Sequence, residues 1–168
     1  MSNSAAFRGE KPAVKPESDA PATFRLAAVP RPALALGLAG LIPFFAGAAA
    51  VHLAEPQWIV FARSALAGYG AVILSFLGGA RWGLACAGVD REGPSWWRLS
   101  VSVTPALIAW AALAAGAQTA LLVGALGLIG LFAADVSLTR AGGAPAWWPA
   151  LRLPLTVGAA ASLLIGAI

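Results

Sequence analysis

The chain has 168 residues, of which 60% are hydrophobic and only 11% charged, with a formal net charge of +4. An ordinary soluble domain carries roughly 25% charged residues, which form the polar shell around its core, so this composition excludes a water-soluble fold and indicates a lipid-embedded chain. The basic residues form no dense run and no nucleic-acid-binding motif, which excludes DNA and RNA as expected partners.

Residues 1–25 differ in composition from the rest of the chain. They are rich in Pro, Ala, Ser and charges of both signs, and they contain few large apolar residues. Such a segment cannot bury enough apolar surface to order itself. The sequence therefore predicts a flexible N-terminal tail over residues 1–28, followed by a helical transmembrane domain over residues 29–168. A cleaved secretory signal is not expected, because no apolar stretch directly follows a charged start.

Long apolar runs recur through the rest of the chain. A helix of about 20 apolar residues crosses a hydrocarbon core of about 30 Å, and the runs are continuous instead of alternating as barrel strands do. The sequence predicts an all-α, polytopic membrane protein of about five transmembrane helices joined by short connections, so neighbouring helices should be antiparallel. The predicted spans are residues 33–54, 64–88, 99–116, 119–138 and 149–168.

Two prolines fall inside predicted spans. Pro43 lies in the first span and Pro105 in the third. Proline has no backbone N–H, so it frees a carbonyl one turn earlier in a helix. Both positions are predicted helix kinks. An alternative is that Pro105 and Ser75 line a polar cavity together with Arg81.

Arg and Lys are distributed unevenly over the connections. Cytoplasmic connections of membrane proteins carry an excess of these residues. If the N-terminus lies inside and the C-terminus outside, every Arg and Lys except Arg63 and Arg81 lies on the cytoplasmic side. Arg152, in the first turn of the fifth span, is expected to extend its side chain to that interface. The Trp pairs at residues 96–97 and 147–148 fall at the same side and are typical of an interfacial aromatic belt.

Arg81 and Asp135 each lie within an apolar run, where an ionised side chain costs roughly 2.5–3.5 kcal/mol at the centre of a span. Both lie a few residues before the inner ends of their spans, at similar depths. We expect them to form an ion pair between the second and fourth spans. The pair has three possible roles: a structural clasp, two charges that reach water separately, or a site that moves protons or ions.

Glycines are frequent in the second span. Gly78, Gly79 and Gly83 include a G-x-x-x-G spacing, and small residues allow transmembrane helices to approach closely. These three are the predicted helix-packing glycines.

Four stretches, at residues 30–43, 69–83, 104–110 and 145–156, carry a resemblance to a known family. With the block SFLGG at residues 75–79 as its most specific part, the chain resembles the domain-of-unknown-function 3429 family of transmembrane protein sixty-nine-like integral membrane proteins. The resemblance implies a multi-span membrane protein, bacterial or organellar, and supplies no activity. The high Ala, Gly and Arg content and the scarcity of Lys favour a GC-rich bacterial source, and hence the bacterial inner membrane.

No catalytic or ligand-binding set is visible. The chain has one His, one Cys and few carboxylates, with no Ser–His–acid set, no metal-ligand spacing and no phosphate loop. We therefore expect no enzyme activity, no cofactor and no metal. The leading hypothesis is a structural or accessory component of the inner membrane whose partners are the bilayer and other membrane proteins. The alternative is a small transporter or channel that uses the Arg81–Asp135 pair.

Overall fold

The computed structural model describes residues 25–87 and 95–168 of the chain. Every regular element within these ranges is a helix, and five helical segments are long and apolar enough to cross a membrane. The prediction of an all-α protein with five spans is confirmed. The elements are η2 (Leu26–Ala28), α1 (Arg31–Ala39), α2 (Ile42–Leu53), α3 (Pro56–Cys86), α4 (Trp96–Ala114), α5 (Ala117–Arg140) and α6 (Trp148–Ala167).

The predicted flexible tail lies mostly outside the described residues, which begin at Arg25. The end of the predicted tail forms the short helix η2, and Val29 directly after it is buried against Ala150 and Leu151 of α6. Arg91, counted above among the cytoplasmic charges, also lies outside the described residues.

The first span, Arg31–Leu53, is divided into α1 and α2. Pro43 is in the first turn of α2, where its missing N–H leaves no helical bond unmade. At the break, the Tyr69 hydroxyl of α3 donates a hydrogen bond to the Gly40 carbonyl at 2.9 Å. Pro43 therefore marks a break in the first span. Pro105 differs, because α4 continues through it as one helix.

The second span is longer than predicted. Residues 55–63 were expected to form a connection, but α3 begins at Pro56 and has 31 residues. Proline at the first helical position is already set to helical φ, and Arg63 is carried on the helix surface, half-buried. At 1.5 Å per residue α3 is about 46 Å long, so it either tilts or extends beyond a hydrocarbon core of about 30 Å.

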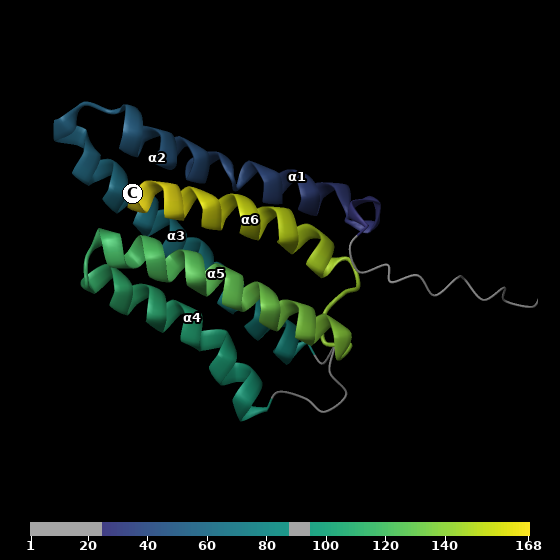
Figure 1. Ribbon diagram of the computed structural model, residues 1–168. Helices are drawn as coiled ribbons and strands as arrows, with labels where there is room; N and C mark the ends of the chain where they lie inside the picture. Colours follow the sequence, from purple (N-terminus) through teal and green to yellow (C-terminus); the bar gives the residue numbers. More distant parts are fainter. Residues whose placement is uncertain (1–24, 88–94) are drawn as a thin grey trace, which may run out of the picture.

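Figure 1 shows the arrangement of the helices in the bundle. Helix α6 lies between α1–α2 and α5, whereas α4 is at the edge beyond α5. Helix α3 packs against α2, α4, α5 and α6, and α6 packs against α1, α2, α3 and α5. Helices α2, α3, α5 and α6 share one hydrophobic core. Its largest fully buried apolar side chains are Phe44, Leu66, Leu74, Leu121, Leu128 and Leu163.

Candidate functional site

Asp135 is the centre of a buried charged cluster. It lies in the last two turns of α5, and its side chain is only 1% exposed. Arg81 of α3 donates from Nη1 to Oδ1 at 2.6 Å, and Arg152 of α6 donates from Nε to Oδ2 at 2.9 Å. The structure thus brings together the two residues singled out in the sequence and adds a third. We call Arg81, Asp135 and Arg152 the Arg–Asp–Arg cluster.

The expectation for Arg152 is wrong. It was expected to extend to the interface, but its side chain is 4% exposed and points into the bundle. The physical reason is the central place of α6, because the face that carries Arg152 is covered by α5. The pairing of Arg152 with Asp135 could have been predicted from the sequence. Arg152 lies four residues after the start of α6 and Asp135 five residues before the end of α5, so the two lie at similar depth in antiparallel helices.

The Arg–Asp–Arg cluster carries one positive charge in excess. Two guanidinium groups share a single carboxylate, and the other acidic residue among the described ranges, Glu55, lies at the opposite end of α3. Buried Nε of Arg81 and buried Nη2 of Arg152 have no hydrogen-bond partner among the described residues. Buried charges are stable only when they are paired, so this site favours a further anionic or acceptor group.

The alternative in which Pro105 and Ser75 line a polar cavity with Arg81 finds no support among the described residues. The hollow beside Arg81 has a volume of about 10 Å³ and is lined by Ala85, Arg98, Ser102 and Leu138 in addition to Arg81. That volume accommodates about one water molecule. The Ser75 hydroxyl instead donates to the Ala71 carbonyl of its own helix.

The three predicted packing glycines have different surroundings. A Cβ on Gly78 would overlap the backbone carbonyl oxygen of Ser102 in α4, so the backbones of α3 and α4 approach closely at Gly78. Gly79 and Gly83 are exposed, and a Cβ on either would meet no heavy atom of the described residues within 4 Å. Within the described part of the chain, the contact therefore depends on Gly78, and the G-x-x-x-G pair takes no part in it.

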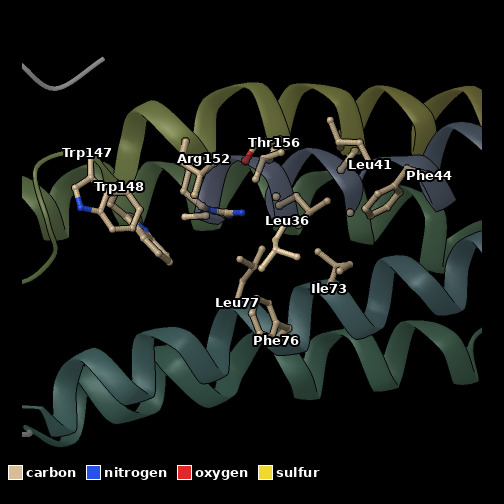
Figure 2. Close-up of a pocket in the computed structure, with 17 residues that line it drawn as sticks. Leu36, Leu41, Phe44, Ile73, Phe76, Leu77, Trp147, Trp148, Arg152 and Thr156 are labelled. Atoms are coloured by element: carbon tan, nitrogen blue, oxygen red, sulfur yellow. The ribbon is translucent and has the colours of Figure 1, made fainter. Parts of the chain in front are cut away.

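A second, larger cavity is lined by Arg152 and lies between α1, α3 and α6 (Figure 2). Its volume is about 330 Å³. We call it the lateral cavity. Apolar side chains form most of its wall, and α6 adds three polar residues, Trp148, Arg152 and Thr156. No sequence pattern pointed to this cavity, although the spacing of four residues between Trp148, Arg152 and Thr156 places the three on one helix face.

The fold and the buried cluster define the chain as a polytopic α-helical membrane protein. It belongs to the family described as protein of unknown function (DUF3429), whose model matches residues 29–168. This range coincides with the helical transmembrane domain delimited from the sequence.

Two animal relatives are named transmembrane protein 69. The one from Xenopus tropicalis is 42% identical over 141 residues, which cover 80% of this chain and 53% of the relative. The one from Mus musculus is 33% identical over 160 residues, which cover 95% of this chain and 64% of the relative. The chain thus spans between about half and two thirds of the length of these relatives. No solved structure was found to match it.

Proposed function

We propose that the chain is a non-enzymatic structural or accessory component of its membrane, in which the Arg–Asp–Arg cluster is a clasp between α3, α5 and α6. The observation on which this proposal chiefly rests is the environment of the Asp135 carboxylate. Both of its carboxylate oxygens accept from arginines, and its side chain is 1% exposed. A carboxylate that carries protons or ions must exchange partners with water or cargo, and these contacts oppose that exchange.

The size of the hollow beside Arg81 supports the same reading. At about 10 Å³ it offers no continuous polar route past the ion pair within the described residues. An accessory protein of this kind acts through contacts with other membrane proteins, and its exposed apolar helix faces are available for them.

Cysteine accessibility separates this proposal from the transporter alternative. In a Cys86→Ser background, Ala85→Cys and Leu138→Cys place a thiol on the wall of the hollow beside Arg81. An accessory protein leaves both thiols unlabelled by a membrane-impermeant polar reagent, whereas a transporter exposes them. Ser95→Cys, at the exposed start of α4, is the matched positive control. Labelling of both wall positions at the rate of the control contradicts the proposal.

The partner is identified by affinity purification from native membranes in mild detergent. An accessory component co-purifies with a defined membrane protein at constant stoichiometry. The same purification of an Asp135→Asn variant tests whether the clasp is needed for the partner surface. A chain that purifies alone from every mild detergent contradicts the accessory role.

We further infer that the chain lies in the bacterial inner membrane with its N-terminus in the cytoplasm and its C-terminus in the periplasm. Eight basic residues support this orientation, against Arg63 on the other side: Arg8, Lys11, Lys15, Arg25, Arg31, Arg91, Arg98 and Arg140. Arg152 no longer counts, because it is buried. Alkaline phosphatase fused after Ile168 should be active and a fluorescent protein there dark. The reverse result contradicts the orientation.

A further inference from the structure

The lateral cavity has a polar end and an apolar end. Figure 2 shows Trp148, Arg152 and Thr156 following one another along α6, with Leu41 and Phe44 beyond them. Arg152 and Thr156 are each 4% exposed. Each of the three α6 residues has one buried side-chain donor without a hydrogen-bond partner among the described residues: Trp148 Nε1, Arg152 Nη2 and Thr156 Oγ1. Three residues with an unpaired donor therefore line one end of the lateral cavity.

The rest of the wall is apolar. It continues from Leu41 and Phe44 to Ile73 and Leu77 of α3 and Ala159 of α6. From Trp148 to Ala159 the helix rises by roughly 16 Å at 1.5 Å per residue, about half the thickness of a hydrocarbon core. The cavity thus runs from the start of α6 towards the middle of the span.

The rim of the lateral cavity is open towards the surface of the bundle. Leu36 of α1 and Phe76 of α3 line it, and they are 75% and 67% exposed. Since these helices span the membrane, that surface faces hydrocarbon, and a ligand would enter sideways from the lipid. The volume of about 330 Å³ lies at the lower end of the 300–1,000 Å³ that is usual for small-molecule sites.

We propose that the lateral cavity binds an amphiphile with an oxyanion headgroup, a carboxylate or a phosphate, and an apolar chain. The headgroup accepts hydrogen bonds from Trp148, Arg152 and Thr156, and the chain lies against Phe44, Ile73 and Leu77. This inference goes beyond the accessory role proposed above and does not depend on it.

Charge complementarity determines the headgroup. The Arg–Asp–Arg cluster holds two guanidinium groups against one carboxylate, and Arg152, which lines the cavity, has no hydrogen-bond partner for Nη2 among the described residues. An oxyanion there balances the excess charge and takes a charge-assisted hydrogen bond, which is stronger than a neutral one. A plain hydrocarbon chain would leave the three donors unpaired, at a cost to the folded state. Basic pockets between transmembrane helices are known to hold anionic lipid headgroups.

The test uses the full chain purified in a neutral detergent. The probe is a long-chain fatty acid that carries a photoreactive diazirine near the end of its tail. After irradiation, peptide mapping should locate the label on residues of α1, α3 and α6 that line the cavity. Unlabelled fatty acid at alkaline pH should compete, and its methyl ester, which has the same tail without the charge, should compete at least tenfold more weakly. An anionic and a zwitterionic phospholipid, added in turn, distinguish a phosphate headgroup from a carboxylate.

Two variants remove one donor each and leave the Arg–Asp–Arg cluster intact. Thr156→Val and Trp148→Phe should each weaken binding by about two- to tenfold, the effect of one hydrogen bond. The matched controls are Thr104→Val and Trp110→Phe on the exposed side of α4, which should leave binding unchanged. Ala159→Phe, which fills the apolar end, should abolish labelling of the cavity residues, and the helical circular dichroism of this variant checks that it is folded.

Several results would overturn the proposal. Equal competition by the acid and its methyl ester shows that the headgroup is not recognised. Equal binding by the parent chain and both donor variants shows that α6 does not hold it. Label spread evenly over all lipid-facing helices shows that the tail is not in the cavity. Competition by the anionic phospholipid alone supports the proposal and assigns the phosphate as headgroup.

Discussion

Helices α4 and α6 are built from similar parts and occupy opposite places in the bundle. They have 19 and 20 residues, each begins with tryptophan, carries an arginine within its first five residues and contains an interior proline. Yet Trp96 is 90% exposed, whereas Trp148 is half-buried and lines the lateral cavity. Helix α6 is the most buried of the five spans and α4 the least.

Polar contacts account for much of this difference. Helix α6 is held near its start by Arg152 and Asp135, and at its end Gln118 of α5 and His52 of α2 bond the carbonyls of Ala167 and Ile165 at 2.7 and 2.9 Å. Because lipid tails are as apolar as leucine, hydrophobicity does not sort helices within a bilayer. Small residues and polar contacts determine which helices pack in the centre of a bundle, and α6 buries more of both than α4 does.

The largest effect is expected from Asp135→Asn. It leaves two buried guanidinium groups without a counter-charge, and breaking a buried ion pair in this way costs about 3–5 kcal/mol. Unfolding in mixed micelles with rising dodecyl sulfate measures the loss. Glu55→Gln, at the exposed start of α3, is the control and should change little. If Asp135→Asn unfolds at the same dodecyl sulfate fraction as the parent, the cluster does not hold α6 in place.

A smaller effect is expected from Leu163→Ala in α6. Leu163 is fully buried and contacts the sites of Gly70 in α3 and Gly124 in α5. The substitution leaves a cavity between three helices and should cost about 2–3 kcal/mol in the same assay. Leu107→Ala in α4 is the matched control, because Leu107 is exposed to lipid. Equal losses for the two variants would mean that α4 and α6 are packed equally well.

Two neighbouring glycines of α3 should respond oppositely to substitution by alanine, because only one of them contacts α4. Gly78→Ala pushes a methyl group into the Ser102 backbone of α4 and should cost about 1–2 kcal/mol through overpacking. Gly79→Ala has open space and should stabilise α3 by about 0.5–1 kcal/mol, the helix preference of Ala over Gly. Unfolding of both variants measures this. A destabilised Gly79→Ala would indicate that a second chain packs on that face.

The smallest loss of stability is expected from Gln118→Met. It removes the donor to the Ala167 carbonyl at nearly constant volume and should cost about 1 kcal/mol. Hydrogen exchange of the last turn of α6 is the sharper measurement, because only that turn should exchange faster. Unchanged exchange there would show that the Gln118 contact contributes nothing to the place of α6.

Local patterns were enough to predict the helices and one buried contact. Continuous apolar runs predicted five spans, and the depths of Arg81 and Asp135 in antiparallel helices placed them within reach of each other. The errors came from residues whose role depends on which neighbour covers them. Arg152 has the pattern of an interfacial arginine, and Pro56 and Arg63 have the pattern of a connection. Gly79 and Gly83 have the spacing of packing glycines, but no neighbour covers them among the described residues.

The sequence alone was sufficient to identify an all-α membrane protein, because only helices and closed barrels can pair every backbone group within a bilayer and its apolar runs are continuous instead of alternating. It was also sufficient to identify the family, through residues 29–168. The central place of α6, the contact of Arg152 with Asp135 and the lateral cavity became visible only in the folded bundle. These features depend on which helix faces meet, and composition and periodicity within one helix do not specify its neighbours.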